Sequence, residues 1–327
     1  MMDSPQITVV VPVYNMGRFL PRAMDALLAQ TFRDFEVIIV DDGSTDGSAD
    51  ICDRQAARDP RCRVVHKPNG GLSSARNAGM AKARGQFVIF PDPDDWVEPI
   101  YLEKLHQLHE QFGTDLEICG RSIVDENCNL IGGTKGKVEV ITQQKALEYL
   151  MDGDHYTGSA CNKLFHFSII KEQNLYFDTD LGMVQDLHFC VRYFMHCQNV
   201  VYNPAHLYNY YQHSGSVTNL NMGLTPRKLS GLLTYQRIAE ITARDFPQIH
   251  DLALGTFFNM SLHFIYIYFA SKMEDQAVLH QLQDNLRNYQ RFFFTSKLYS
   301  PFHKFLGWLA MRTPRGYYWL KRTHFRE

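Results

Sequence analysis

Three carboxylates, those of Asp92, Asp94 and Asp95, follow directly after a run of apolar residues. The run at 87–90 is β-prone and predicts a buried strand, which cannot carry three unpaired charges into the core. The strand must therefore end here and present the aspartates at its carboxyl end. Closely spaced carboxylate oxygens are the ligands that Mg²⁺ and Mn²⁺ prefer, so the pattern predicts a divalent metal site, with a solvated acidic loop as the alternative.

The first 112 residues alternate between strand and helix patterns, which positions these aspartates. The expected strands are 7–13, 35–40, 63–66 and 87–90, and the expected helices are 18–30, 45–58, 73–83 and 101–112. Strand and helix in turn at this spacing predict βαβ units and an α/β fold with a mostly parallel sheet. The carboxyl ends of the strands then meet at one edge, where open α/β sheets bind their ligands.

Each strand of this sheet leads into residues suited to a nucleotide with phosphates. The segments are Pro12-Val13-Tyr14-Asn15, Asp41-Asp42-Gly43-Ser44 and Lys67-Pro68-Asn69-Gly70-Gly71, together with the Asp92 cluster. An aromatic ring, acids, a cation and a glycine pair thus converge. The sequence has neither a Gly-x-Gly-x-x-Gly fingerprint after the first strand nor a phosphate-binding P-loop, which argues against a dehydrogenase and a P-loop NTPase. Helix capping by Asp41 or Asp42, and a simple turn at the glycines, are the alternatives.

Four segments, 11–15, 40–48, 69–79 and 92–96, resemble in order and spacing the family 2 glycosyltransferases with the GT-A fold. The resemblance covers about residues 5–122 and continues more thinly to about 218. It implies metal-dependent, inverting transfer of a sugar from a nucleotide diphosphate, with a UDP-sugar as the expected donor and Mn²⁺ or Mg²⁺ as cofactor. The donor-binding residues that it implies are Pro12, Tyr14, Asn15, Asp41, Asp42, Asn69, Gly70, Arg76, Asp92 and Asp95.

Within this set the resemblance implies individual roles. Tyr14 would stack on the base, Asp42 would hydrogen-bond it, and Arg76 would lie near the pyrophosphate. Asp92 and Asp94 match the metal motif and would hold the metal and the ribose, and Asp95 would instead orient the sugar. From the residues alone, an arginine on a helix such as Arg76 is more often a solvated residue or a salt-bridge partner than a ligand.

The resemblance also points to a catalytic base, Asp186, in a segment where the family usually has Glu-Asp and this chain has Gln185-Asp186. A carboxylate there would take the proton of an acceptor hydroxyl. Because Gln185 replaces the usual glutamate, other groups must orient Asp186. The alternative role of Asp186 is to cap the helix that follows. His213 follows Tyr211, which replaces the arginine usual in the family, and we expect His213 to be a third metal ligand or a pyrophosphate donor.

The last third of the chain is predicted to be helical, which divides the protein into a catalytic domain at 1–220 and a helical region at 221–327. The apolar stretch 252–270 still contains polar residues and predicts a buried helix rather than a membrane span, which needs about 20 apolar residues. The tail 297–327 carries seven basic residues against Glu327, interleaved with aromatics. That pattern is typical of interfacial membrane contact, with a helical pair packed on the core as the alternative. No stacking platform for nucleic acid is expected.

Composition sets broader limits on the interpretation. The chain has 327 residues and a net charge of −2, so no general affinity for polyanions is expected. Seven cysteines without a Cys-x-x-Cys pair, and no expected signal peptide, predict a cytoplasmic enzyme that is peripheral at the membrane and acts on a surface glycan or lipid-linked acceptor. A non-catalytic nucleotide-sugar-binding protein, suggested by Gln185, and a sugar nucleotidyltransferase are the rival functions. A sugar nucleotidyltransferase would need a glycine-rich loop with lysine and arginine after the first strand, and residues 14–18 match such a loop poorly.

Overall fold

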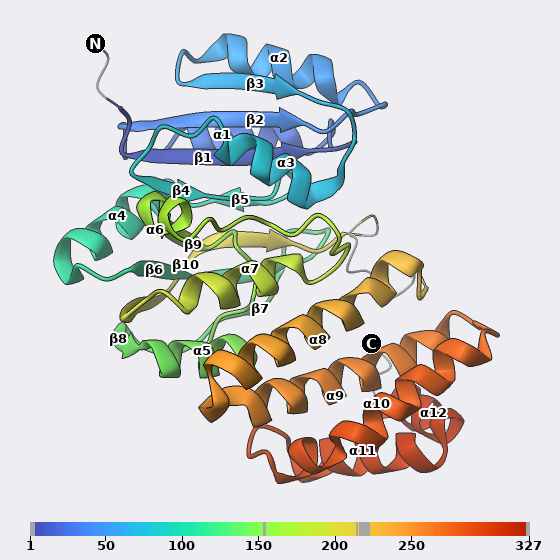
Figure 1. Ribbon diagram of the computed structural model, residues 1–327. Coiled ribbons are helices and arrows are strands. Elements are labelled where there is room, and N and C mark those ends of the chain that lie inside the picture. The colour runs from blue at the N-terminus through green and yellow to red at the C-terminus, as the bar shows by residue number, and fades with distance from the viewer. Residues whose placement is uncertain (1–3, 153–154, 214, 216–222, 325–327) are drawn as a thin grey trace. The chain divides into compact units, whose positions relative to one another are not determined.

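The computed structural model describes residues 4–152, 155–213, 215 and 223–324. The chain divides into two compact units (Figure 1). The N-terminal unit comprises residues 1–180 and 185–213, and the C-terminal unit comprises 181–184 and 214–327. The domain boundary predicted at residue 220 lies outside the described residues.

The N-terminal unit contains a single large sheet with helices on both faces. Its strands are β1 (Ile7–Val13), β2 (Phe35–Asp41), β3 (Cys62–His66), β4 (Phe87–Ile89), β5 (Trp96–Val97), β6 (Leu116–Val124), β7 (Leu130–Gly133), β8 (Glu139–Thr142), β9 (Lys163–His166) and β10 (Asn199–Tyr211). Its helices are α1 (Leu20–Leu28), α2 (Ser48–Arg58), α3 (Gly71–Met80), α4 (Tyr101–Phe112), α5 (Gln143–Asp152), α6 (Phe167–Glu172) and α7 (Gln185–Phe194).

The strand order is β3-β2-β1-β4-β9-β6-β10-β5, with β7 paired to β6 and β8 paired to β10. The first four strands are parallel, as expected for βαβ units, and β10 runs parallel to β6. The predicted α/β fold class is therefore confirmed. Strand β9 has no counterpart among the expected elements, and it lies antiparallel between β4 and β6. Its sequence, Lys-Leu-Phe-His, has only two apolar residues, and a run this short does not distinguish a strand from the start of a helix.

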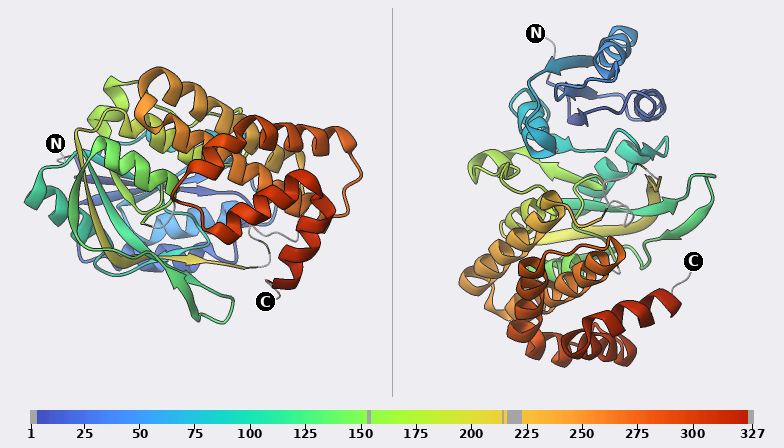
Figure 2. Two further views of the ribbon diagram at one scale, coloured as in Figure 1. Left: turned by 90° about the horizontal axis from the view of Figure 1, so that it is seen from below. Right: turned by 90° about the vertical axis from the view of Figure 1, so that its right-hand side faces the viewer.

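Helix packing explains why β1 and β2 are almost continuously apolar. Every residue of both strands is buried, because α3 covers one face of this part of the sheet and α1 and α2 cover the other (Figure 2). Helix α3 approaches β1 very closely at Gly79, where an added Cβ would lie 2.3 Å from a methyl group of Val10. A rigid parallel sheet with closely packed helices therefore supports the loops at its carboxyl edge.

The described residues of the C-terminal unit form five helices, which are coloured orange to red in Figure 1. They are α8 (Pro226–Asp245), α9 (Pro247–Ala270), α10 (Gln276–Thr295), α11 (Pro301–Arg312) and α12 (Pro314–His324). Thr225, Asp275 and Ser300 cap α8, α10 and α11 with their side chains, each accepting a hydrogen bond from a backbone N–H of the first turn. The predicted helical character of this region is thus observed throughout its described residues.

Helix α9 is the central helix of this unit and contacts α8, α10, α11 and α12. Its length and composition would also allow it to cross a membrane, but 67% of its most apolar window is buried within the protein. The tail folds as the helical pair α11 and α12, with Leu306, Ala310 and Tyr317 buried. The Tyr317 hydroxyl donates to the Leu262 carbonyl oxygen of α9 at 3.2 Å. The alternative of a packed helical pair therefore describes one face of the tail.

Candidate active site

The loops that follow β1 and β2 are joined by Asn15. Its backbone N–H donates to Ser44 Oγ at 3.1 Å, and its Oδ1 accepts from the Thr45 N–H at 2.8 Å. Asn15 has a φ of 54°, a left-handed conformation that asparagine tolerates better than most residues. Beside it, 47% of Tyr14 is exposed, whereas Pro12 is buried within β1. The phenol ring is thus available to stack on a planar ligand.

Asp42 holds the loop that leads into α3. Its carboxylate accepts hydrogen bonds from the N–H of Gly70 at 3.0 Å and of Gly71 at 2.7 Å, and it forms an ion pair with Lys67. Only 2% of Asp42 is exposed. Asp42 therefore positions this loop, which the sequence did not indicate, and its predicted hydrogen bond to a nucleotide base stays a prediction. Asn69 and Gly70 are exposed at the edge of the sheet.

Asp41 closes the turn after β2 and does not cap α2. It accepts from the Ser44 N–H at 3.1 Å and pairs with His66 Nδ1 at 3.0 Å. Burial would raise the pKa of Asp41, but the hydrogen bonds from Ser44 and His66 outweigh burial and lower it. Gly43 completes the turn with a φ of 71°, and an added Cβ would lie 2.8 Å from the Asn69 backbone nitrogen. The turn therefore requires glycine at this position.

Arg76 on α3 joins the predicted metal motif to the predicted base. It is fully buried, and its guanidinium donates to Asp92 Oδ1 at 2.8 Å and to Asp186 Oδ1. The second oxygen of Asp186 accepts from the Ala160 N–H at 3.1 Å. Of the two interpretations of Arg76, the structure bears out the salt-bridge partner. It brings Asp92 and Asp186, which are 94 residues apart in the chain, onto one planar cation.

The backbone that binds Asp186 is itself held by a buried cation. Lys163 Nζ donates to the carbonyl oxygens of Thr157 at 2.8 Å and Ser159 at 2.7 Å. Lys163 is fully buried, and burial lowers its pKa. These hydrogen bonds hold the loop that contains the Ala160 N–H. This N–H and Arg76 together orient the Asp186 carboxylate, for which the sequence, with Gln185 in place of the usual glutamate, indicated no partner.

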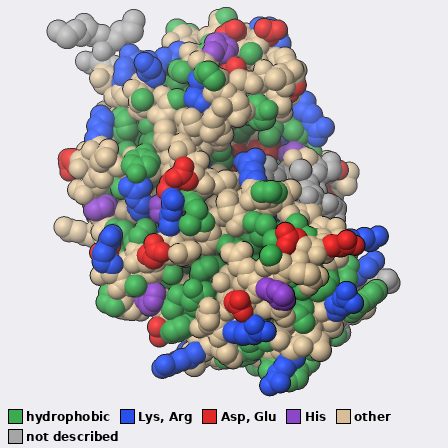
Figure 3. Space-filling view, turned by 45° about the vertical axis from the view of Figure 1, so that its right-hand side comes forward, with side chains coloured by type: hydrophobic (Ala, Val, Ile, Leu, Met, Phe, Trp, Pro, Cys, Tyr) green, Lys and Arg blue, Asp and Glu red, His purple; other side chains and the backbone are tan. Residues whose placement is uncertain are grey.

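Negative charge exceeds positive charge around Asp92. Burial raises the pKa of Asp92 to about 7, with a smaller opposing effect from Arg76 and further increases from the charges of Asp186 and Asp94. In Figure 3 the carboxyl edge of the sheet is turned toward the viewer, and acidic side chains are visible in a hollow of this face. A divalent cation would relieve this excess of carboxylate charge.

Asp94 and His213 supply the other two predicted metal ligands. His213 Nε2 lies 3.1 Å from Asp94 Oδ2, and its ring packs against Phe19 and Tyr211 with centroids 4.5 and 5.4 Å apart. Arg22 on α1, which the sequence did not single out, donates to the Asp94 carbonyl oxygen at 2.7 Å. The structure therefore brings the two predicted ligands together on a supported loop.

Asp95 points into the protein and anchors β10. The Tyr208 hydroxyl donates to Asp95 Oδ2 at 2.6 Å and accepts from the Asp92 N–H at 3.1 Å, while the Tyr211 N–H donates to Asp95 Oδ1 at 2.8 Å. Burial, together with the charges of Asp94 and Asp92, raises the pKa of Asp95 well above its usual value. Tyr208 is thus a positioning residue that the sequence analysis missed, since its partner lies 113 residues away.

Comparison with known proteins identifies the family of this chain. The sequence model of Glycosyl transferase family 2 matches residues 8–173. The uncharacterized glycosyltransferase EpsJ of Bacillus subtilis (strain 168) is 32% identical over 220 residues, which are 66% of this chain and 64% of EpsJ. The chain thus spans slightly less than two thirds of the length of that relative.

Solved structures share the fold. The S. aureus TarS 1–349 structure in complex with UDP-GlcNAc has a TM-score of 0.70 at 19% identity and covers 98% of this chain and 91% of its own. The mannosyltransferase PcManGT from Pyrobaculum calidifontis, in complex with GDP-Man and Mn²⁺, has a TM-score of 0.59 at 16% identity and covers 100% and 89%. The chain belongs to glycosyltransferase family 2, and the GT-A fold predicted from its sequence is confirmed.

Proposed function

We propose that this glycosyltransferase transfers a sugar from a UDP-sugar to an acceptor hydroxyl with inversion at the anomeric carbon, and that the reaction depends on a divalent metal. One observation carries the proposal. The buried Arg76 guanidinium holds Asp92 and Asp186 together, so that the metal motif and the base lie at one edge of the sheet. A leaving group and an attacking group must meet across a single carbon, which requires such proximity.

The side chains of Asp92, Asp94 and His213 would hold Mn²⁺ or Mg²⁺. Two carboxylates and one imidazole form a donor set that suits Mn²⁺. Burial and the nearby charges of Asp186 and Asp94 raise the pKa of Asp92, and a cation beside this carboxylate would offset both effects. A bound cation supplies positive charge to the departing diphosphate. The known Mn²⁺ complex of PcManGT supports this choice of metal.

Asp186 would act as the general base. It accepts the proton of the acceptor hydroxyl while the hydroxyl oxygen forms a bond to the anomeric carbon. The bond from that carbon to the diphosphate oxygen breaks on the opposite face, and its electron pair leaves with the diphosphate. Arg76 and the Ala160 N–H hold Asp186 in one orientation, because both donate to its carboxylate.

Turnover and donor binding must be measured separately to test this proposal. With Mn²⁺ and a panel of UDP-sugars, Asp186→Asn should lower kcat by about 10²–10⁴-fold and leave donor binding unchanged. Asp94→Asn should weaken metal-dependent donor binding. Arg58→Gln, which alters an exposed ion pair far along α2, serves as the control. Donor binding without turnover in the wild type would favour a non-catalytic binding protein, and binding that ignores chelator would contradict the metal role.

The donor class and the acceptor rest on different support. TarS binds UDP-GlcNAc on the same fold, which supports a UDP-sugar, although PcManGT binds GDP-Man. We propose a surface glycan or lipid-linked oligosaccharide as acceptor. A thermal-shift screen of UDP- and GDP-sugars tests the donor, since a ligand that binds only the native state raises its stability.

We further propose that the tail contacts the cytoplasmic face of a membrane. The aromatic side chains Phe302, Phe305, Trp308 and Trp319 are 42–59% exposed, and Lys297, Arg312, Arg315 and Arg322 are exposed with them. Exposed aromatic and basic residues together favour an anionic lipid surface. Lys321 is not part of this surface, since its ammonium packs 4.9 Å from the Tyr266 ring.

Co-sedimentation with vesicles tests the membrane proposal. The full chain should bind vesicles that contain anionic lipid, and binding should fall with salt. Phe305→Ser with Trp308→Ser should reduce it at least tenfold. Leu130→Ser with Ile131→Ser, which removes two exposed apolar residues of β7, is the matched control. Equal binding of both double variants would refute the assignment to the tail.

A further inference from the structure

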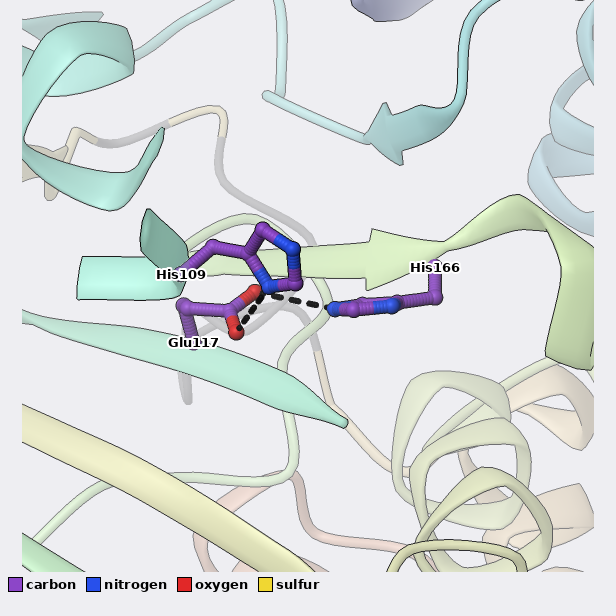
Figure 4. Close-up of side chains that lie close together, drawn as sticks. All are labelled: His109, Glu117 and His166. Atoms are coloured by element: carbon purple, nitrogen blue, oxygen red, sulfur yellow. Dashed lines mark hydrogen bonds and ion pairs between the residues drawn. The ribbon is translucent and has the colours of Figure 1, made fainter. Parts of the chain in front are cut away.

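Two histidines and a glutamate meet at the edge of the sheet opposite the active site. Glu117 is the second residue of β6, His109 lies in the last turn of α4, and His166 ends β9 (Figure 4). His166 pairs with Phe87, the first residue of β4, whereas the Asp92 motif follows the other end of that strand. The triad of His109, Glu117 and His166 is therefore separate from the predicted metal site of the glycosyltransferase.

The three side chains converge with the spacing of a metal centre. Glu117 Oε1 lies 3.2 Å from His109 Nδ1, and Glu117 Oε2 lies 3.4 Å from His166 Nε2. One ligand atom from each residue lies within 4.8 Å of the other two. Ligands about 2.0–2.1 Å from a tetrahedral Zn²⁺ lie about 3.3 Å from one another, which is close to the distance between each histidine nitrogen and the Glu117 oxygen nearest to it. Small adjustments of the side chains would place all three around one ion.

The charge and hydrogen bonding of Glu117 also call for a cation. Its side chain is fully buried, and Thr114 Oγ1 donates to Oε1 at 2.9 Å. Among the described residues, neither Glu117 Oε2 nor His166 Nε2 has a hydrogen-bond partner, because their 3.4 Å approach lacks hydrogen-bond geometry. The Phe87 ring packs 4.8 Å from both imidazoles. A buried carboxylate oxygen that accepts no hydrogen bond is costly unless positive charge lies beside it.

We propose that His109, Glu117 and His166 bind one Zn²⁺ ion, at a site distinct from the catalytic metal. Two imidazoles select Zn²⁺ over Mg²⁺, whereas the carboxylates near Asp92 favour harder ions. The side chains of His109 and His166 are 25% and 15% exposed, so that a water molecule can complete the coordination. Thr114 orients the carboxylate from behind, as second-layer partners of metal ligands do.

The position of the site indicates a structural role. The ligands come from α4, β6 and β9, and β9 is the short antiparallel strand between β4 and β6. A bound ion would join the end of a helix to two neighbouring strands. Zn²⁺ should therefore stabilise the N-terminal unit, because an ion that binds only the folded state shifts unfolding by mass action.

Titration of the chelator-treated full chain with Zn²⁺ tests the proposal. By calorimetry, the wild type should bind one equivalent at this site, and His166→Ala should bind it about 100-fold more weakly or not at all. His109→Ala is a second variant, at a partly exposed position that tolerates truncation better. His106→Ala is the matched control, since His106 also packs on Phe87 but lies outside the triad. Its Zn²⁺ affinity should equal that of the wild type.

Two further measurements separate this site from the catalytic one. In the Asp94→Asn background, Zn²⁺ should still bind and still raise the unfolding temperature, whereas in Glu117→Gln the stabilisation should disappear. Co²⁺ in place of Zn²⁺ should give the visible absorption of a four-coordinate ion in the wild type and lose it in His109→Ala. Zn²⁺ affinity unchanged in both histidine variants, or lost in Asp94→Asn alone, would overturn the proposal. So would a wild type that binds no Zn²⁺.

Discussion

Replacing Arg76 by methionine should sharply destabilise the N-terminal unit. The methionine fills much of the same volume but leaves Asp92 and Asp186 facing each other without their shared cation. Arg76 is 0% exposed, and removing one partner of a buried ion pair costs about 3–5 kcal/mol. The comparable Arg58→Met breaks an ion pair with Asp25 whose side chains are 51% and 58% exposed, and it should cost about 0–1 kcal/mol.

Thermal unfolding with chelator present measures the difference between the two variants. A unit of this size loses about 2–4 °C per kcal/mol, so Arg76→Met should lower its unfolding temperature by about 6–20 °C. Tryptophan fluorescence reports on both units, because Trp96 lies in this unit and Trp308 and Trp319 lie in the other. Circular dichroism at several wavelengths should therefore be recorded as a second signal. When Mn²⁺ replaces the chelator, part of the lost stability should return, because a cation at Asp92 replaces some of the missing charge.

A second substitution shows whether the loss comes from charge. In the Arg76→Met background, Asp186→Asn should cost less than it does in the wild type, or even stabilise, because it removes an unpaired carboxylate. The reasoning is refuted if Arg76→Met is as mild as Arg58→Met. It is also refuted if Asp186→Asn has the same effect in both backgrounds.

Three other predictions concern the packing and the charges of the N-terminal unit. Tyr208→Phe removes the hydroxyl that joins Asp95 to the Asp92 N–H, and it should lower the free energy of urea unfolding by about 1–3 kcal/mol. An unchanged urea midpoint would show that these two hydrogen bonds do not stabilise the protein. Gly79→Ala should cost about 1–3 kcal/mol by overpacking against β1, and Val10→Ala in the same chain should recover part of that cost, whereas additive losses would contradict the close approach. Hydrogen bonds outweigh burial and lower the pKa of Glu36, so its contribution to stability is present above about pH 4 and is lost as the pH falls below it. Glu36→Gln should therefore make the free energy of unfolding fall less steeply at acidic pH. If the fall is the same as in the wild type, other groups cause the loss of stability in acid.

The local pattern of the sequence was sufficient for much of the sheet. Strand β1 has the predicted bounds, and β2, β3 and β4 differ from their expected ranges by a residue, because long apolar runs between turn formers leave few alternatives. The glycosyltransferase motifs likewise lie within short segments, so that their order in the chain identifies the family. Helix α4 was predicted correctly for a similar reason, since its apolar residues repeat along one face.

The order and spacing of the residues were thus enough to predict the α/β class, the family and the set of acidic, aromatic and glycine residues at the ends of the strands. How those residues are used depends on the three-dimensional packing. It turned Arg76 inward to hold Asp92 and Asp186, it engaged Asp42 and Asp95 in supporting contacts, and it assembled the histidine and glutamate triad at the far edge. These partners are separated by many residues in the chain and carry no local pattern. Their pairing follows from the packing of whole strands and helices, because a buried charge is costly unless the fold brings an opposite charge or a hydrogen-bond partner beside it.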